Sequence, residues 1–246
     1  MSIRIRTATL ADLAALAALN REAYPEFVQD GVVFDTEHLR AHQNRFPPGQ
    51  LVAELDGEIV GAMATMIPPR ALDPLAPHTW LGITDSATFA RHDPDGDTLY
   101  LADIYVHSRA WGAGVGRALY AALFALCKQL GLANVVGGGR LYDFVDAEEF
   151  ISPADYVAQV IRGERRDRVL VSQLRAGFEV RGLLPGYLHD WRSRHVATLI
   201  VWDNPDRKIA EVDLLGRAGV GLGGSDLVGV RPGHDLHGLD VRGRRG

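Results

Sequence analysis

Residues 98–119 read TLYLADIYVHSRAWGAGVGRAL, an apolar run that enters a turn with alternating glycines and continues into an apolar helix pattern. Gly112, Gly114 and Gly116 let the main chain approach a ligand closely and adopt dihedral angles that other residues avoid. A helix that begins at such a turn leaves its first backbone amides unpaired and carries a partial positive charge there. The stretch therefore predicts a strand, a loop and a helix that together hold a phosphorylated cofactor.

The spacing of these glycines excludes two classes of phosphate-binding loop, the dinucleotide-binding loop and the loop that ends in Gly-Lys-Ser/Thr. A dinucleotide-binding loop follows G-x-G-x-x-G, but the last position is Arg117 when counted from Gly112 and Leu119 when counted from Gly114. A phosphate loop that ends in Gly-Lys-Ser/Thr is also excluded, because Arg117 follows Gly116. A glycine-rich connection that binds no ligand remains as the alternative.

The pattern that remains resembles the acyl-coenzyme A loop of the GNAT superfamily of N-acyltransferases. In that loop, a strand ending in Val precedes Arg/Gln-x-x-Gly-x-Gly/Ala at the start of a helix. Val106 ends the strand here, Gly114 and Gly116 fill the glycine positions, and Trp111 stands where Arg or Gln is usual. That position usually acts through its backbone amide, so the resemblance implies that acetyl-CoA still binds. The residues that the resemblance implies in cofactor binding are Ile104, Tyr105, Val106, Trp111, Gly112, Ala113, Gly114, Val115, Gly116 and Arg117.

Patterning along the rest of the chain predicts helices interspersed with strands. Thr9 begins a helix with Asp12 at its capping-box position, and Asp35 begins a second, shorter helix. Asp56-Gly57 is a strong two-residue hairpin turn. Strands are expected at residues 3–6, 50–55, 58–66, 98–106, 133–137, 169–171, 178–184 and 197–202, and further helices at 115–130 and from 152 onwards.

This order of a helical pair, a hairpin and then strand–loop–helix–strand also resembles the GNAT fold. The fold class implied is α/β (α+β), with a mixed, mostly antiparallel central sheet, a splayed strand pair and flanking helices. We expect residues 1–206 to form the acyltransferase domain, and the Gly-rich residues 207–246 to form a flexible tail in which a short helix could occupy 209–215. Residues 68–96 form a long connection of a kind that often acts as a lid.

The second half of the chain is similar to one GNAT subgroup, which includes acetyltransferase modules fused to carbon–nitrogen hydrolase (nitrilase-like) domains. The similarity rests on DYVAQVIRGERRDRVLVSQLRAGFEVRGLLPGYL at residues 155–188 and on ATLIVWDNP at residues 197–205. It covers about residues 3–206. The remaining residues are too few for a hydrolase domain, so none is expected within this chain.

Composition predicts a soluble, cytoplasmic protein. The net charge of −5, with no basic run before the last few residues, argues against a nucleic-acid partner. The apolar run at residues 13–19 is too short to span a membrane. Cys127 cannot form an internal disulfide, and we expect it to be buried and inert in a reducing compartment. No metal site is expected, because no zinc-ligand spacing is present and His38 and His42 are expected on a solvated helix face.

Acyl transfer from a thioester to an amine requires a neutral amine, a polarised carbonyl group and a proton donor for the thiolate. Because a lysine-like amine with a pKa of about 10 is mostly protonated at neutral pH, a carboxylate is needed to help deprotonate it. Asp103, Tyr105 and His107 alternate along the predicted strand and could share one face. The resemblance implies Asp103 as the base or amine anchor, since it lies three residues before Val106. The alternatives are an Asp103 carboxylate bound only by backbone amides or an arginine, and a His107 exposed in the turn rather than relaying a proton.

The proton donor is the point at which the sequence departs from the family pattern. Many GNAT enzymes carry Tyr four residues before a Gly-Phe pair, and here that position holds Gln173. Glutamine cannot act as a general acid, although its amide could form a hydrogen bond with the cofactor thiol. Tyr142 is the nearest substitute in sequence and is the candidate catalytic residue, with Tyr105 and Tyr187 as alternatives.

Arg140 follows three glycines at the end of a predicted strand, where the active sites of open sheets tend to lie. It could bind a substrate carboxylate, or it could form a structural ion pair. Taken together, the resemblance implies an acetyl-CoA-dependent N-acetyltransferase that acts on a small-molecule or peptide amine by direct attack. A non-catalytic acyl-CoA-binding adaptor is the alternative, and a homodimer is compatible with either.

Overall fold

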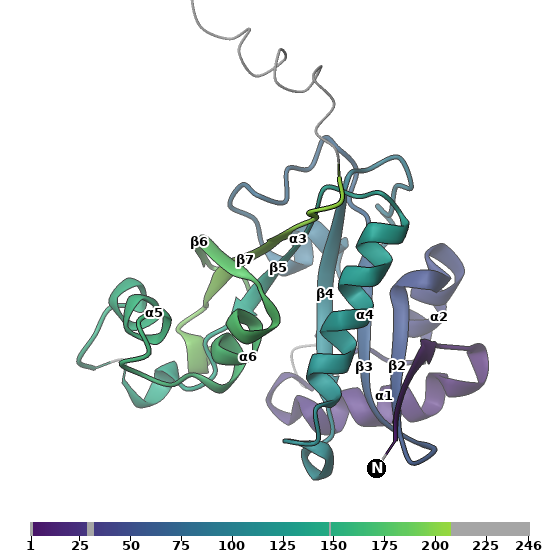
Figure 1. The fold of residues 1–246 in the computed structure, drawn as a ribbon, viewed down its shortest axis with the longest axis horizontal. Helices are drawn as coiled ribbons and strands as arrows, with labels where there is room; N and C mark the ends of the chain where they lie inside the picture. Colours follow the sequence, from purple (N-terminus) through teal and green to yellow (C-terminus); the bar gives the residue numbers. More distant parts are fainter. Residues whose placement is uncertain (1, 29–31, 148, 208–246) are drawn as a thin grey trace, which may run out of the picture. The chain divides into compact units, whose positions relative to one another are not determined.

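The computed structural model describes residues 2–28, 32–147 and 149–207 (Figure 1). Within these residues the strands form a seven-stranded sheet in the order β1-β2-β3-β4-β5-β7-β6. Only β4 and β5 pair in parallel, and all other neighbours are antiparallel. This confirms the mixed, mostly antiparallel fold class. The strands are β1 (Ile3–Thr7), β2 (Gln50–Leu55), β3 (Glu58–Met66), β4 (Thr98–Val106), β5 (Asn134–Arg140), β6 (Glu179–Pro185) and β7 (Val196–Asp203).

Helices cover both faces of the sheet. In Figure 1, α4 lies across the front of β2–β4, whereas α1 passes behind the same strands. Each face buries its own apolar cluster, one beneath α1 and α2 and the other beneath α4. The helices are α1 (Leu13–Ala23), α2 (Thr36–Arg45), α3 (Trp80–Thr84), α4 (Val115–Gln129), α5 (Pro153–Ile161) and α6 (Arg168–Ala176).

The local signals for helix starts and for the hairpin are confirmed. The Asp12 carboxylate accepts hydrogen bonds from the Thr9 backbone amide at 2.7 Å and from its hydroxyl at 2.9 Å, and a short 3₁₀ turn then leads into α1. Asp35 caps α2 by accepting bonds from two backbone amides. Asp56 and Gly57 both adopt left-handed backbone angles, as a tight turn between β2 and β3 requires.

The expected strand at residues 169–171 is wrong, because these residues lie in α6. The Asp167 side chain caps this helix by accepting bonds from the amides of Val169 and Leu170. Leu170 and Gln173, which are three residues apart, are both buried on one face. Two β-branched valines favour a strand locally, but the cap and the helical spacing of buried residues decide the outcome.

His42 differs from expectation in its burial, whereas Cys127 does not. His42 is 1% exposed rather than solvated, because its ring stacks on Phe89 at 3.6 Å and its Nε2 lies 2.6 Å from the Ala87 carbonyl. Burial lowers the pKa of His42 to about 4. Cys127 is fully buried, as expected, and desolvation raises the pKa of its thiol to about 12.

The long connection at residues 68–96 packs into the protein core. It carries α3, and its two large aromatic side chains, Trp80 and Phe89, are buried against Phe34. No helix in the described part of the chain is both long enough and apolar enough to cross a lipid bilayer. The expected tail and its short helix at residues 209–215 lie outside the described residues.

The parallel strands β4 and β5 separate partway along their length. They pair from Thr98 and Asn134 as far as Leu101 and Gly137, and beyond that point neither strand pairs with the other. The register of β4 against β3 also shifts at Ala64/Thr65. The expected splayed pair is therefore present, and residues 102–106 face residues 138–140 without sheet hydrogen bonds between them.

Candidate active site at the splayed strands

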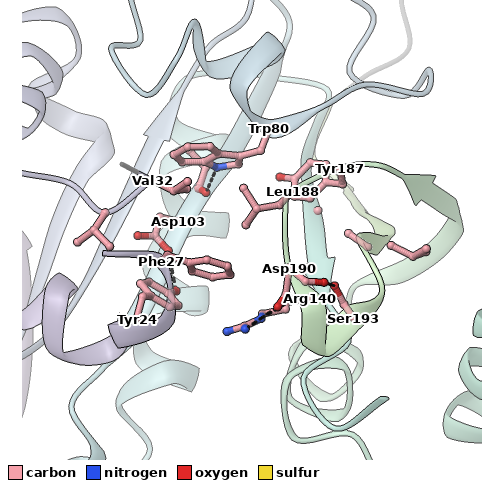
Figure 2. Close-up of a pocket in the computed structure, with 15 residues that line it drawn as sticks. Tyr24, Phe27, Val32, Trp80, Asp103, Arg140, Tyr187, Leu188, Asp190 and Ser193 are labelled. Carbon is pink, nitrogen blue, oxygen red and sulfur yellow. Dashed lines mark hydrogen bonds and ion pairs between the residues drawn. The ribbon is translucent and has the colours of Figure 1, made fainter. Parts of the chain in front are cut away.

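An open cavity lies where β4 and β5 separate. Its walls come from the end of α1, from α3, from both splayed strands and from the β6–β7 loop (Figure 2). Apolar and aromatic side chains form most of the lining. The charged side chains that line it are Asp103, Arg140 and Asp190.

Asp103 is held in the wall of this cavity by two side chains of the α1 segment. Its carboxylate accepts a hydrogen bond from the Tyr24 hydroxyl at 2.7 Å and one from Asn20 Nδ2 at 2.8 Å (Figure 2 shows the Tyr24 contact). Asn20 is itself fixed, because its Oδ1 accepts a bond from the Phe34 backbone amide at 2.8 Å. No cation contacts the Asp103 carboxylate among the described residues. An arginine therefore does not neutralise it.

The protein around Asp103 removes most of the hydration of its carboxylate, although the side chain borders the cavity. Desolvation raises its pKa from 3.8 to about 6, and the hydrogen bonds from Tyr24 and Asn20 limit the rise. At neutral pH the group is therefore ionised, yet it binds a proton far more readily than an ordinary aspartate. These are the properties of a general base.

The raised pKa predicts how stability depends on pH. Because the folded protein holds the Asp103 proton more tightly than the unfolded chain, this stabilisation is complete below about pH 3.8 and is lost as pH rises through about 6. We expect the Asp103→Asn variant to gain stability relative to the wild type between pH 4 and pH 6. Urea unfolding of both proteins at each pH measures the difference, and a difference independent of pH would contradict the shift.

The predicted shared face of β4 is confirmed. Asp103, Tyr105 and His107 all point toward α1. The Tyr105 hydroxyl donates to the Leu16 carbonyl at 3.4 Å, and His107 Nε2 lies 3.1 Å from the Glu22 carboxylate. Tyr105 is buried at this contact, whereas His107 is half-buried at the strand end.

The edge of β4 that faces away from β3 carries carbonyl oxygens bound by side chains instead of by a neighbouring strand. In a strand the amide and carbonyl of one residue point to the same edge, so the amides of Ile104 and Val106 lie there too. Such amides can polarise a bound carbonyl group. The side-chain donors are Trp80 Nε1 to Ala102 at 2.8 Å, the Tyr24 hydroxyl to Ile104 at 3.0 Å, and Trp111 Nε1 to Val106 at 2.8 Å.

The predicted cofactor loop lies at the end of β4. Gly112 and Gly114 adopt φ values of +78° and +91°, which only glycine adopts easily. Gly114 caps α4, so the first-turn amides that follow it are those a helix leaves unpaired. Trp111 is 60% exposed, and its backbone amide donates to Ser108 at 3.1 Å. Val115 is buried, Ala113 and Gly116 are half-buried, and Arg117 is exposed.

Gln173 lies on the opposite face of the sheet from the cavity. It is 3% exposed and faces Gly139 of β5, where an added Cβ would lie 2.5 Å from its Oε1. The Tyr120 hydroxyl is close enough to share a hydrogen bond with the Gln173 side chain. The Oε1 atom has no hydrogen-bond partner among the described residues. A buried acceptor without a partner is unusual in a folded protein, and this one lies next to the splayed strands.

Arg140 is engaged by two carboxylates. It donates to Asp190 from Nε at 2.7 Å and from Nη2 at 2.9 Å, and to Glu26 from Nη2 at 2.8 Å. Arg192 approaches Glu26 at 3.9 Å. These four residues form an acid–arginine cluster beside the cavity. The ion pair left open by the sequence is present, whereas binding of a substrate carboxylate stays a prediction.

Tyr142 packs among arginine side chains that include Arg140. Its ring stacks against the guanidinium groups of Arg140, Arg168 and Arg192 at 4.6–5.1 Å. It does not border the cavity that Asp103 lines. A catalytic role for Tyr142 stays a prediction without a contact in this structure to support it.

Asn20, Tyr24 and Trp80 contribute to the site but were not identified from the sequence. Asn20 and Tyr24 are four residues apart, the spacing that places side chains on one helix face, so their common direction could have been noticed. Their partner Asp103 is 83 residues from Asn20. Trp80 lies in a connection without any local pattern that marks a binding wall.

Comparisons with known proteins agree with this architecture. YkwB of Bacillus subtilis, named an uncharacterized N-acetyltransferase, is 31% identical over 204 residues, which cover 82% of this chain and 89% of YkwB. The probable hydrolase YhcX of the same organism is 33% identical over 204 residues, which cover 82% of this chain but only 39% of YhcX. The second match agrees with the similarity to hydrolase-fused modules.

Among solved structures, the GphF GNAT-like decarboxylase in complex with isobutyryl-CoA superposes with a TM-score of 0.68 at 27% identity. The match covers 82% of this chain and 99% of that chain. The cofactor class predicted from the glycine loop, an acylated coenzyme A, agrees with that complex. The model of the Acetyltransferase (GNAT) family matches residues 13–138, and the chain belongs to this family of acyltransferases.

Proposed function

We propose that the protein transfers the acetyl group of acetyl-CoA to a primary amine by direct attack within a ternary complex. The observation that carries this proposal is Asp103, a carboxylate with a pKa of about 6 in the wall of the cavity at the splayed strands, which has no cationic partner among the described residues. It stands beside the β4 edge, where backbone amides are available to the thioester. A base and a carbonyl-polarising group are thus provided at one place.

The charges around the cavity favour a cationic acceptor. Glu26, Asp190 and Asp103 supply three carboxylates, whereas Arg140 and Arg192 supply two guanidinium groups. One negative charge is left when Asp103 is ionised. An ammonium group would be held by this charge, and transfer of a proton to Asp103 would give the neutral amine that attacks.

The single cysteine of the chain is not placed to form an acyl-enzyme intermediate at Asp103. Cys127 lies in the buried cluster beneath α4, and its raised pKa keeps the thiol protonated. This supports transfer in one step. The amide of Val106 would stabilise the oxyanion that forms as the amine attacks, since the amide of Ile104 acts on the Asp103 carboxylate.

Calorimetry with acetyl-CoA, followed by measurement of thiol release over a panel of small amines and amino-terminal peptides, tests the proposal. We expect binding and amine-dependent release of one thiol per acetylated product. Absence of binding at millimolar acetyl-CoA would overturn the interpretation of the loop. Binding without thiol release on any amine would support the adaptor instead.

Decarboxylation of a 2-carboxyacyl-CoA is a second candidate, favoured by the 27% identity to the GphF GNAT-like decarboxylase. In that reaction the carbon–carbon bond to the carboxylate breaks, carbon dioxide leaves, and the resulting enolate takes a proton. Protonated Asp103 could supply that proton, since its pKa lies near 6. Incubation with malonyl-CoA distinguishes the candidates, because only a decarboxylase forms acetyl-CoA without an added amine.

The unpaired Gln173 oxygen leads to a prediction about the thiol side of the reaction. A Gln173→Leu variant keeps much of the side-chain volume but removes the amide that could bind the sulfur. We expect kcat to fall about fivefold to tenfold, the value of one hydrogen bond, with unfolding free energy changed by at most about 1 kcal/mol. Steady-state kinetics and urea unfolding measure the two effects. An unchanged kcat would remove Gln173 from the site.

A further inference from the structure

We propose that Tyr187, Tyr100 and His78 form a proton exit from the cavity to the protein surface. The proposal rests on the function proposed above and adds to it the route by which the reaction loses its proton. Tyr187 borders the same cavity as Asp103, and Figure 2 shows the two side chains on facing walls. The Tyr100 hydroxyl lies 2.8 Å from that of Tyr187 and 2.9 Å from His78 Nε2.

The chemistry of acetyl transfer requires such a route. An ammonium acceptor loses two protons while its nitrogen forms a bond to the acetyl carbon and the carbon–sulfur bond breaks. One proton is taken up by the departing thiolate to give the free thiol of coenzyme A. The second proton is left over in every turnover and has to leave a cavity whose open side receives the cofactor and the acceptor.

The hydrogen-bond partners of His78 determine the direction in which protons are donated along the relay of Tyr187, Tyr100 and His78. His78 Nδ1 lies 2.8 Å from the Ala76 carbonyl, which can only accept, so the ring proton of neutral His78 is on Nδ1. Nε2 is then an acceptor, and the Tyr100 hydroxyl donates to it. Because the Tyr100 proton is used there, the Tyr187 hydroxyl donates to the Tyr100 oxygen. The hydroxyl protons of Tyr187 and Tyr100 therefore both point away from the cavity and toward His78.

Tyr187, at the cavity end of the hydrogen-bonded relay, can accept a proton from the cavity. The Gly138 backbone amide lies close enough to the Tyr187 oxygen to favour its charged form, and the hydroxyl keeps a lone pair for a donor in the cavity. Gly138 lies just beyond the last pairing of β5 with β4, and a Cβ at this position would collide with the Tyr187 ring. Glycine is thus what allows the hydroxyl to lie over the splayed strands.

His78, at the other end of the relay, lies close to solvent. His78 is half-buried, and its neighbours Pro77 and Thr79 are exposed. Tyr100 is fully buried and does not border the cavity, so its hydroxyl serves only to connect the two ends. Burial raises the pKa of Tyr100 and of Tyr187 above the ordinary value, so both hydroxyls relay protons as neutral groups.

Each group in the relay that takes up a proton also gives one up. Tyr187 takes a proton from the cavity as it passes its own to Tyr100, and Tyr100 passes its own to His78 Nε2. The imidazolium that forms gives up a proton to water, and rotation of the hydroxyls restores the starting arrangement. Burial lowers the pKa of His78 below its ordinary value, so the imidazolium gives up its proton readily. Asp73 is the charged side chain that acts on His78 among the described residues, and it offsets part of this lowering.

A Tyr100→Phe variant tests the connection, because it breaks the chain without touching the cavity. We expect kcat to fall about tenfold, less than for loss of a group in contact with substrate, with the KM for acetyl-CoA unchanged. Tyr156→Phe is the matched control, since Tyr156 is equally buried, donates one hydroxyl bond to Asp167, and lies in a separate apolar cluster. Equal kcat values for the two variants would overturn the proposal.

His78→Ala tests the outer end with a readout that a structural role would not give. We expect kcat to fall and to be restored by added imidazole, because the half-buried site admits a small base. Addition of imidazole to the Tyr100→Phe variant should restore nothing. Rescue of both variants, or of neither, would contradict a chain that ends at His78.

Nitrogen-15 spectra of the His78 ring test the direction of the chain without any enzymatic assay. We expect the proton on Nδ1 at neutral pH, and a proton on Nε2 would overturn the proposal. This measurement tests the proton relay independently of the proposed acetyl transfer. Failure of the wild type to acetylate any amine would reject the proposed function, whereas the ring spectra decide the direction of the chain in either case.

Discussion

Replacement of Asp103 with Asn is expected to lower kcat about 10²- to 10⁴-fold while the affinity for acetyl-CoA stays unchanged. Asparagine has the shape of aspartate and can still accept the Tyr24 hydroxyl bond, but it cannot take a proton from the acceptor amine. Steady-state thiol release gives kcat, and calorimetry gives the dissociation constant of the cofactor. The separation of the two quantities distinguishes a lost base from a lost binding site.

Asp95→Asn is the matched control, because Asp95 is exposed and does not line the cavity. It carries the same change of charge and should keep the wild-type kcat. A wild-type kcat in the Asp103→Asn variant would show that the carboxylate does not act as the base. The relay from Tyr187 would then be the remaining route for deprotonation of the amine.

The part of the site that the sequence predicts is the part built from one continuous segment. The left-handed Gly112 and Gly114 and the common face of Asp103, Tyr105 and His107 depend on residues 98–119 alone, whereas the splayed strand pair is implied by the family resemblance. Alternation along a strand and glycine spacing are local properties, so one stretch of sequence suffices to fix them. The same holds for the caps at Thr9 and Asp35.

The part that the sequence does not predict depends on contacts between distant segments. Arg140 is bound by Glu26 and Asp190, which are 114 and 50 residues away. His42 has the spacing of a surface helix residue, yet the folded 68–96 connection covers it through Phe89. Local pattern gives the direction of a side chain, whereas burial depends on which distant segment packs over it.

The Tyr100–Tyr187 contact shows this limit most clearly. Its two hydroxyls are 87 residues apart in sequence, and each tyrosine lies in a segment that reads as ordinary apolar core. Gly138 is the one local signal, because a glycine run inside a strand indicates close approach of another group. The sequence shows that something approaches the strand there, and only the fold shows that it is Tyr187.

The Gly116→Leu variant is expected to weaken acetyl-CoA binding about 10²-fold, which corresponds to about 3 kcal/mol of steric conflict. A Cβ at Gly116 meets no atom within 4 Å in the protein itself, and leucine is a better helix former than glycine by about 0.8–1 kcal/mol. The fold should therefore be as stable as the wild type or more so. Calorimetry and urea unfolding measure the two effects.

Ala121→Leu is the control, since Ala121 is exposed on the same helix and away from its first turn. It should change neither quantity by a comparable amount. A truncated thioester that lacks the pyrophosphate, such as S-acetyl-N-acetylcysteamine, sharpens the result. If the first turn of α4 holds the phosphates, Gly116→Leu lowers kcat/KM for acetyl-CoA but not for the truncated donor. Equal losses with both donors would mean that the leucine disturbs the cavity, and the pyrophosphate would have to bind elsewhere.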